Sequence, residues 1–427
     1  MRALQHRAHA WVTAAIVATV LLLPVLTLAP GLASSVSVLS TPLFAAPVSL
    51  PDSSGFGEPS IAAAPDGTLY VVAPGTATWR SDNHGASWTR QANTLGNAGD
   101  ADVAVDANGV VYGSDLSNQE PVSVSTDKAT SYAYVTATNP NQGDRQWIAA
   151  AGAGNVYAFV NHNGNAEFSV SHDQAHTFGS VSNAIVGMTD GGNLLAASSS
   201  DLYIAFVDAT SVGVAVSHNG GASWTPRMAG PIGGASCTFP TVARDAAGTL
   251  YLAWCELIGS ILPTTARIAV AVSKDDGATW SAPRVLSNDV NYNVFPWVVA
   301  GNAGRVFVTW YEGVPPGLLA GLPIRDPEFA FLVDWHVEVA WSLNGDQASP
   351  AWQREAVTGV SHTGPIAHEL GGLLDFFEMV EQPGGNVAIT YAGGNAVPPT
   401  DLSGNNPGTV ASLFAVVQTG GSNLRTG

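Results

Sequence analysis

The sequence predicts an all-β fold, a β-propeller built from four-stranded antiparallel blades. Two repeated patterns lead to this prediction. The first is the phrase Ser-x-Asp/Asn-x-Gly-x-Ser/Thr-Trp, whose best copies begin at Ser81, Ser217 and Ser273. The second is an apolar strand, a glycine turn and a strand that carries an aromatic residue. Recurrence at a spacing of about 45 residues is typical of folds that stack one supersecondary unit many times.

The Ser-x-Asp phrase has the chemistry of a tight hairpin turn. Its Asp or Asn side chain can accept hydrogen bonds from backbone amides, and its glycine allows a positive φ angle. The terminal aromatic ring can then pack beneath the turn. Weaker copies begin at Ser125 and Ser171, and a degraded copy begins at Ser342. We therefore expect a hairpin at each copy.

The strand–turn–strand pattern gives the number of blades. Its seven copies open at Glu58, Asp100, Arg145, Gly191, Phe239, Phe295 and Phe376. Each of the first six copies is followed by a third strand, the Ser-x-Asp phrase and a fourth strand. Four strands repeated seven times predict a seven-bladed propeller. Six blades with an appended sheet are the alternative, because the last copy lacks the phrase.

The start of the chain resembles a secretory leader. A basic beginning is followed by an apolar run from Trp11 to Ala29 and a small-x-Ala site, so residues 1–33 are predicted to be a signal peptide. An uncleaved membrane anchor is the alternative. Residues 34–54 are predicted to be a linker with a strand that closes the ring, and residues 55–427 the propeller. The mature protein is expected to be secreted, monomeric and free of the membrane.

The charge balance excludes one class of partner. The sequence has 15 Lys and Arg residues and 33 Asp and Glu residues. Removal of Arg2 and Arg7 with the leader leaves 13 basic residues and a net charge of −20. Such a surface repels phosphate backbones, so we do not expect nucleic-acid binding.

The two cysteines, Cys237 and Cys255, flank a predicted hairpin in a chain that is predicted to be exported. The pairing of the two strands brings these positions together, and an oxidising compartment preserves disulfides. A disulfide is therefore predicted. Two buried free thiols are the alternative, and two cysteines without a nearby pair of histidines make a poor zinc site.

Strand direction assigns the two faces of the predicted ring. If the first strand of each blade runs from the top face downward, the glycine turns and the Ser-x-Asp hairpins lie at the bottom. The second-to-third loops and the blade-to-blade loops lie on top. All four long insertions belong to these top loops: Glu256–Ala266, Glu312–Asp334, Thr358–Leu374 and Gly393–Pro407. The top is therefore the expected working face.

The Ser-x-Asp phrase resembles the Asp-box, or BNR repeat, of the sialidase superfamily, over roughly residues 55–420. This resemblance implies a propeller and hydrolysis of glycosidic bonds. Members that are sialidases use a Tyr–Glu nucleophile pair, an aspartate as acid/base and three arginines that grip the substrate carboxylate. Tyr311 and Glu312 match the pair in residue type. The first blade opens with Glu58 where the family has an Arg-Ile-Pro phrase.

The alignment of the repeats predicts a cup of charged residues at the channel entrance. Its members are Glu58, Asp100, Asp144, Arg145, Asp190 and Asp375. Two steps deeper stand Asp102, Trp147, Trp297 and Glu378. Aromatic faces stack on sugar rings and carboxylates bond hydroxyl groups, so a sugar site is one interpretation. A calcium site is a second. In the third, the acids bond backbone amides at strand ends.

The predicted function is that of a secreted sialidase-like exo-glycosidase that acts on extracellular glycans. Its predicted catalytic residues are Asp100, Asp144, Tyr311 and Glu312. The alternative is a non-catalytic exported propeller that binds glycan or protein through its top face. No cofactor is expected, apart from the calcium alternative.

Overall fold

The computed structural model describes residues 40–96, 99–232, 237, 239–258, 265–288, 290–315, 333–364, 373–394 and 411–426. In this part of the chain all regular secondary structure is β-strand. The predicted signal peptide and the middle of each long insertion lie outside the described residues.

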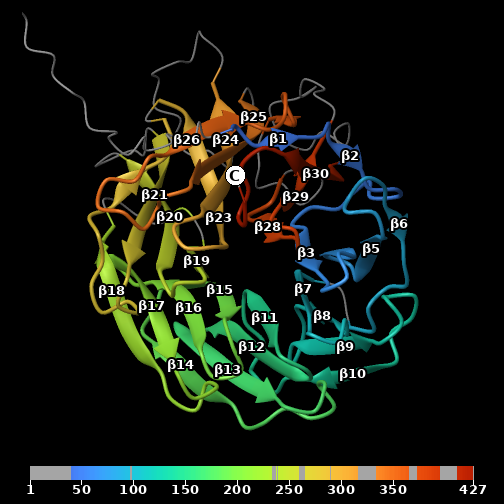
Figure 1. Ribbon diagram of the computed structural model, residues 1–427. Helices are drawn as coiled ribbons and strands as arrows, with labels where there is room; N and C mark the ends of the chain where they lie inside the picture. The colour runs from blue at the N-terminus through green and yellow to red at the C-terminus, as the bar shows by residue number, and fades with distance from the viewer. Residues whose placement is uncertain are drawn as a thin grey trace, which may run out of the picture. The chain divides into compact units, whose positions relative to one another are not determined.

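The strands form a ring around a central axis (Figure 1). The first strand of each repeat is innermost, and these inner strands contact one another in a closed circle. In order around the ring they are β3 (Ser60–Ala63), β7 (Ala101–Val105), β11 (Gln146–Ala151), β15 (Asp190–Ala196), β19 (Thr241–Arg244), β23 (Tyr292–Ala300) and β28 (Glu378–Glu381).

Four blades are separate sheets of four antiparallel strands, as predicted. They begin with β3, β7, β11 and β15. Their other strands are β4 (Leu69–Ala73), β5 (Ala77–Ser81), β6 (Thr89–Arg90), β8 (Val111–Asp115), β9 (Pro121–Ser125), β10 (Tyr134–Ala137), β12 (Asn155–His162), β13 (Asn165–Ser171), β14 (Ser182–Val186), β16 (Leu202–Val207), β17 (Ser211–Ser217) and β18 (Thr225–Pro231).

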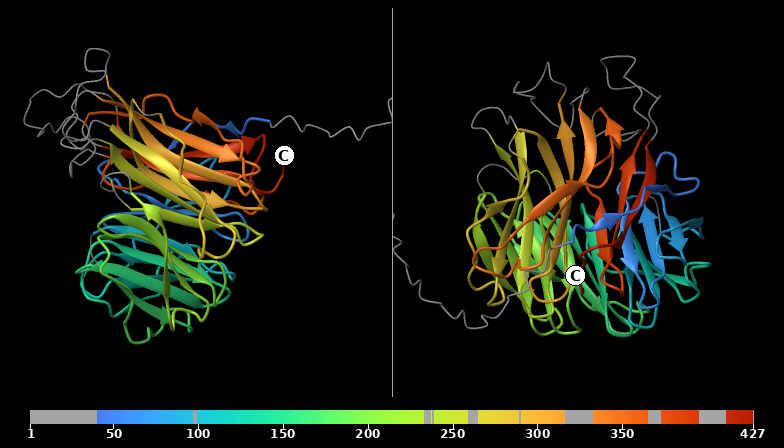
Figure 2. Two further views of the ribbon diagram at one scale, coloured as in Figure 1. Left: turned by 90° about the vertical axis from the view of Figure 1, so that its left-hand side faces the viewer. Right: turned by 45° about the horizontal axis from the view of Figure 1, so that its top comes forward.

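A fifth separate blade joins the two ends of the described chain. It contains β28, β29 (Val387–Gly393) and β30 (Ser412–Gly420). Two short N-terminal strands, β1 (Leu43–Phe44) and β2 (Val48–Ser49), both pair antiparallel with β30. In Figures 1 and 2 the blue N-terminal segment lies beside the red C-terminal strand. The linker segment thus completes the last blade.

The remaining strands form one nine-stranded sheet, which differs from the prediction of seven, or six, separate sheets. It contains two antiparallel groups joined by a single parallel pair, Ala266 with Tyr292. The strands are long, nine residues in β20, β21, β23 and β24, so β21 and β23 reach one another. The members not yet given are β20 (Leu250–Ile258), β21 (Thr265–Ser273), β22 (Arg284–Val285), β24 (Val306–Val314), β25 (Asp334–Ser342), β26 (Gln353–Ala356) and β27 (His362–Thr363).

Two of the second strands, β4 and β16, are apolar along their whole length because neighbouring blades cover both of their faces. All five residues of β4 and all six of β16 are buried. A strand with two covered faces loses the alternation of apolar and polar residues that a half-exposed strand shows. The hydrophobic core therefore lies between the blades, in several clusters around the ring.

The repeated phrase forms the same hydrogen-bonded turn in its copies. In the copy at Ser217, the Oγ atom accepts a bond from Gly221 N (2.9 Å) and donates one to Asn219 Oδ1 (2.9 Å). Asn219 Oδ1 also accepts a bond from Ser223 N at 2.9 Å. The copies at Ser81, Ser125, Ser171 and Ser273 make the same three contacts. Two side chains, the serine and the Asn or Asp, therefore fix the turn that the sequence predicts.

The glycine of the phrase has two advantages: it adopts a positive φ angle without strain, and it leaves room for a side chain packed against it. Gly221 has a φ of +87°, and a Cβ there would lie 2.2 Å from Phe168. Ala129 and Ala175 occupy the same place in the weaker copies, with φ of 60°. An alanine at positive φ carries a steric cost that glycine avoids.

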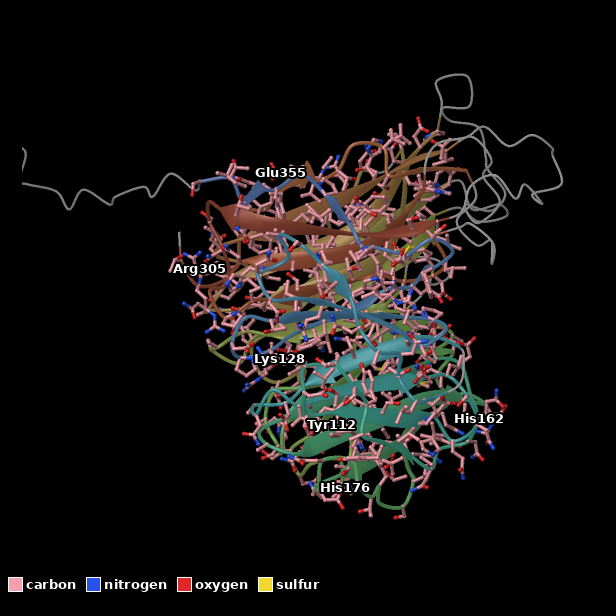
Figure 3. The ribbon with its side chains drawn as sticks, turned by 90° about the vertical axis from the view of Figure 1, so that its right-hand side faces the viewer. Tyr112, Lys128, His162, His176, Arg305 and Glu355 are labelled. Carbon is pink, nitrogen blue, oxygen red and sulfur yellow. A yellow bond between two sulfur atoms is a disulfide. The ribbon has the colours of Figure 1, made fainter. Side chains whose placement is uncertain are left out.

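The two faces of the ring follow from the antiparallel connections. Figure 3 shows Lys128, in a Ser-x-Asp turn, and Arg305, in a first-to-second turn, on one side. His162, at the end of a second strand, lies on the other side. We call the side with the Ser-x-Asp turns the turn face and the other the insertion face.

Cys237 and Cys255 form a disulfide, which confirms the predicted pairing. Cys255 lies in β20 and is completely buried. A disulfide is consistent with an extracellular location. Among the described residues there is no helix that could span a lipid bilayer.

The first prediction concerns the repeated turn. Ser217→Ala leaves the buried Gly221 N–H without its acceptor, so we expect the free energy of unfolding to fall by about 1–3 kcal/mol. Asn219→Asp introduces the residue that three other copies have, and we expect a change within about 0.5 kcal/mol. Urea unfolding of both variants tests this, and an equal loss in the two would contradict the role given to the serine.

The second prediction concerns the disulfide. Replacement of both Cys237 and Cys255 by alanine is expected to lower the free energy of unfolding by about 3 kcal/mol, because the unfolded chain loses a closed loop. Intact mass before and after reduction and alkylation checks that the native protein carries the bond. Alkylation of the unreduced protein at both cysteines would show that the bond is absent.

Candidate binding site at the channel mouth

The inner strands present one layer of side chains at equivalent positions around the channel. These side chains stand two residues after the start of each repeat. They are Ser60, Asp102, Trp147, Asn193, Thr241, Trp297 and Glu378. The sequence predicts Asp102, Trp147, Trp297 and Glu378 in this layer, and the same register would have given Ser60, Asn193 and Thr241.

Polar members of the layer bond the backbone of the next inner strand. Asp102 Oδ2 accepts a hydrogen bond from Ile148 N (2.7 Å), and Glu378 Oε2 accepts one from Ile61 N (3.0 Å). Asn193 bonds both N and O of Val242, at 2.7 and 3.0 Å. The inner strand is the edge of its blade, so the backbone amides on the side that faces away from the blade need such partners. This is the third interpretation of the channel acids, and it holds for the deep layer.

A single hydroxyl group lies between two buried carboxyl groups. Ser60 Oγ is 2.7 Å from Asp102 Oδ1 and 2.7 Å from Glu378 Oε2. The hydroxyl has one hydrogen and can donate to only one of these oxygens. The second contact then requires a proton on the other carboxyl group. Burial, with repulsion from Asp102, raises the pKa of Glu378 to about 8, and burial also raises the pKa of Asp102.

Arg145 is the buried cation beside these carboxyl groups. It is fully buried, and its guanidinium carbon lies 3.8 Å from the ring centre of Trp147 and 3.5 Å from that of Phe376. Its Nη1 donates to Ala101 O (3.2 Å), and its Nη2 is 3.6 Å from Glu378 Oε1. Both ring contacts give cation–π stabilisation.

The predicted acidic cup is present on the insertion side of Arg145. Glu58, Asp100, Asp144, Asp190 and Asp375 interact electrostatically with one another there. Glu58 is buried and bonds the side chain of Asp375, whereas Asp144 and Asp375 are exposed at the rim. Asp100 bonds the side chain of Asp144. The structure thus brings together every predicted member of the cup.

Crowding of carboxyl groups changes their acidity. Burial is the largest cause for Glu58 and, with the bond to Asp375 and nearby acids, raises its pKa to about 11. Burial, with repulsion from Asp375 and Asp144, raises the pKa of Asp190 to about 8. The pKa values of Asp100 and Asp144 are raised chiefly by burial, and the charge of Arg145 opposes both shifts. At neutral pH the cup therefore holds protonated and ionised carboxyl groups together.

An aromatic plug closes the channel beneath the cup. Trp147 lies 5.8 Å from Trp297, 5.6 Å from Phe239 and 5.9 Å from Phe376, measured between ring centres. The space left among these rings is about 10 Å³, which is less than one water molecule needs. The plug separates the cup from the turn-face half of the channel.

Tyr311 and Glu312 lie apart from the cup in their recorded contacts. The Tyr311 hydroxyl is completely buried, donates to Ala392 O (3.0 Å) and accepts from Ala392 N (3.0 Å). Glu312 faces the outer strands, where its Oε2 is 3.3 Å from Arg354 Nη1. Adjacent residues of a strand point to opposite faces, which separates the two side chains. Their geometry gives no support to a nucleophile pair.

One buried acid next to the cup was missed by the sequence analysis. Glu120 precedes β9, accepts hydrogen bonds from Ser117 N (3.1 Å) and Gly143 N (3.4 Å), and is repelled by Asp100 and Asp144. Burial is the main reason that its pKa is raised to about 8. No motif in the sequence marks it, because a lone acid in a loop resembles any exposed residue.

The described residues hold no group of three or more His, Cys, Asp or Glu side chains arranged to bind a metal ion. The absence of a cofactor stays a prediction.

Comparison with known proteins supports the propeller fold. No family model and no curated protein matches the sequence. YCF48 bound to D1 peptide is similar with a TM-score of 0.52 and 12% identity, over 91% of this chain and 100% of that chain. The NanB sialidase from Streptococcus pneumoniae gives 0.45 and 12%, over 88% and 70%. The Fusarium graminearum α-L-arabinofuranosidase Arb93A gives 0.46 and 12%, over 87% and 97%. At such identities the likeness concerns the fold alone.

The third prediction is a fall in stability as the pH rises from 5 to 8. Glu378 has a folded pKa of about 8 against an ordinary value of 4.5, so in this window the folded state holds a proton that the unfolded state has lost. Stability from this group is therefore complete below pH 4.5 and is lost as the pH approaches 8, by at most about 1.4 kcal/mol per pH unit. Glu378→Gln, which mimics the protonated form, should reduce this loss.

Urea unfolding at pH 5 and pH 8 measures the effect. Glu381→Gln, at the end of the same strand and paired with the exposed Arg425, is the matched control and should keep the dependence of the wild type. An identical pH dependence in the wild type and in Glu378→Gln would refute the shared proton.

Proposed function

We propose that this chain is an exported propeller that binds neutral glycans through the acidic cup. The observation that carries this proposal is the convergence of Glu58, Asp100, Asp144, Asp190 and Asp375 above a buried arginine and an aromatic floor. Ionised and protonated carboxyl groups together accept and donate hydrogen bonds. Sugar hydroxyl groups need both kinds of partner.

The charge of the cup favours a neutral ligand over an acidic sugar. A sialidase needs accessible arginines for the carboxylate of its substrate, whereas Arg145 is fully buried against Trp147 and Phe376. A ligand carboxylate at the rim would meet Asp144 and Asp375 first, and like charges repel. The proposed ligand class is therefore a neutral glycan rather than a sialoside.

Hydrolysis of a neutral glycoside is the second candidate function. It is favoured by the hydrogen bond between Asp100 and Asp144, both of which have raised pKa values. A protonated carboxyl group next to an ionised one is the pair that glycosidases use as acid and base or nucleophile. Tyr311 and Glu312 have no part in this version.

We also propose that the repeated turns are Asp-boxes of the sialidase superfamily and that residues 1–33 are a cleaved leader. The common hydrogen bonds of the Ser-x-Asp copies support the first of these. The disulfide supports export. A monomer that meets extracellular glycans with its insertion face is consistent with both.

The fourth prediction tests the cup. A glycan-array screen of the mature protein should give binding to neutral glycans and none to sialosides. Asp144→Asn and Asp375→Asn each remove a rim carboxylate, and we expect about tenfold weaker binding of the selected glycan, because each loses a charge-assisted hydrogen bond. Asp82→Asn changes an exposed acid on the turn face and should bind as the wild type.

A panel of aryl glycosides run in parallel tests hydrolysis. Turnover that Asp100→Asn and Asp144→Asn both abolish would support the second candidate. Selective binding of sialosides, or neutral-glycan binding that Asp144→Asn and Asp375→Asn leave unchanged, would overturn the proposal.

A further inference from the structure

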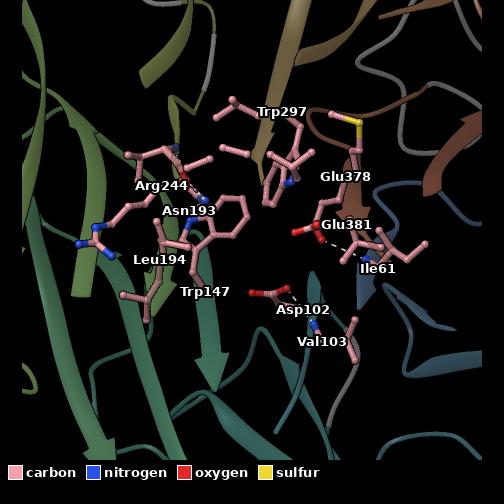
Figure 4. Close-up of a pocket in the computed structure, with 18 of the residues that line it drawn as sticks. Ile61, Asp102, Val103, Trp147, Asn193, Leu194, Arg244, Trp297, Glu378 and Glu381 are labelled. Atoms are coloured by element: carbon pink, nitrogen blue, oxygen red, sulfur yellow. Dashed lines mark hydrogen bonds between the residues drawn. The ribbon is translucent and has the colours of Figure 1, made fainter. Parts of the chain in front are cut away.

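The turn-face half of the channel contains a pocket of about 240 Å³ (Figure 4). It reaches the last residues of three inner strands, Arg244, Ala300 and Glu381, and its inner end meets the aromatic plug. The acidic cup lies on the opposite side of that plug. The pocket is thus separate from the proposed glycan site and does not depend on it.

Most of the pocket wall is apolar. Inner strands around the ring contribute Ile61, Val103, Ile148, Leu194, Val242 and Val298. Trp147 and Trp297 lie at the plug end, and Trp297 is partly exposed there. A flat apolar molecule can therefore stack against indole and leave water.

The polar groups at the plug end are incompletely bonded. Glu378 lines the pocket, is 3% exposed, and its Oε1 has no hydrogen-bond partner among the described residues. Figure 4 shows its carboxyl group directed toward the middle of the pocket. In the described part of the chain, no hydrogen bond is found for Trp297 Nε1. A buried acceptor and an indole donor thus share one end of the pocket.

The charges around this end favour a neutral ligand. Arg145 Nη2 lies 3.6 Å from Glu378 Oε1, so a ligand ammonium group would be repelled by the guanidinium group. Asp102 and Glu378 share one proton, and the negative charge that remains on the pair would repel a ligand carboxylate. A hydroxyl group can donate to Glu378 and accept from Trp297 at once, and it carries no charge to desolvate.

We propose that this pocket binds a small, flat, neutral molecule with one hydroxyl group, such as a phenol or a cyclic alcohol. The hydroxyl bonds Glu378 and Trp297, and the ring fills the apolar part. A volume of about 240 Å³ compares with the roughly 150 Å³ of an engineered cavity that takes up benzene. This size suits a ring with one or two small substituents.

The fifth prediction uses p-cresol as the probe, with 4-methylbenzylamine and 4-methylbenzoate as its cationic and anionic analogues. Isothermal titration and saturation-transfer NMR should show millimolar binding of p-cresol and at least tenfold weaker binding of both analogues. Each analogue carries a charged group that would lose its water and come to lie near a protein group of the same charge, whereas p-cresol is neutral.

Three variants locate the probe. Trp297→Phe keeps the ring but loses the N–H donor, so p-cresol should bind about threefold to tenfold more weakly. Ala300→Trp blocks the mouth of the pocket at a partly exposed position and should abolish binding. Asp144→Asn, in the cup, should bind p-cresol as the wild type.

Three results would overturn the proposal: no binding of p-cresol to the folded protein at about 10 mM, equal binding of a charged analogue, or binding that survives Ala300→Trp. Loss of binding in Asp144→Asn would place the probe in the cup and would equally refute the pocket. Because glycan binding is read separately on the array, failure here leaves the proposed function standing.

Discussion

The ring depends on hydrogen bonds that pass from each inner strand to the next. An inner strand has one edge paired within its blade and one edge that faces the channel. In the described part of the chain only β23 pairs with another strand at that second edge, through the single Ala266–Tyr292 pair. Asp102, Asn193 and Glu378 supply the missing partners through their side chains. The other contacts between blades are mainly apolar, with further hydrogen bonds such as those from Gly154 N to Asp106 and from Gly304 N to Asp245. Apolar contact sets the distance between blades but not their register. The side-chain bonds therefore fix where one blade stands against the next.

Because Asp102 and Glu378 make these bonds, two carboxyl groups are buried in the core. Neighbouring residues reduce the free-energy cost of burying their charge. Arg145 supplies one positive charge between two aromatic rings, and Ser60 allows Asp102 and Glu378 to share a proton. A buried pair with one partner removed is strongly destabilising, because the remaining charge has lost its solvent and its partner. The same residues thus hold the ring and make the stability of the protein depend on pH.

The aromatic plug gives the channel two ends of different chemistry. Toward the insertion face, five carboxyl groups form a polar cup that is open at Asp144 and Asp375. Toward the turn face, mostly aliphatic side chains form a pocket with Glu378 at its inner end and Arg244 and Glu381 at its outer end. Trp147 belongs to both, because it stacks on Arg145 and also lines the pocket. A ligand at one end would contact the plug that forms the floor of the other.

Local patterns in the sequence determined the turns, the strands and the membership of the cup. The Ser-x-Asp turn is made by residues within seven positions of each other. The repeat register places Glu58 and Asp100 at the start of their repeats and Asp375 one residue before the start of its own. Both features can therefore be read from sequence order. Tertiary structure alone decided the rest. The merging of β21 and β23 depends on how far long strands extend, and the burial of Arg145 depends on Phe376, more than 200 residues away. Protonation of Glu378 depends on Ser60 and Asp102, which only the closed ring brings within hydrogen-bond distance. Contacts of this kind join residues far apart in the chain, and neither local propensity nor residue spacing encodes them.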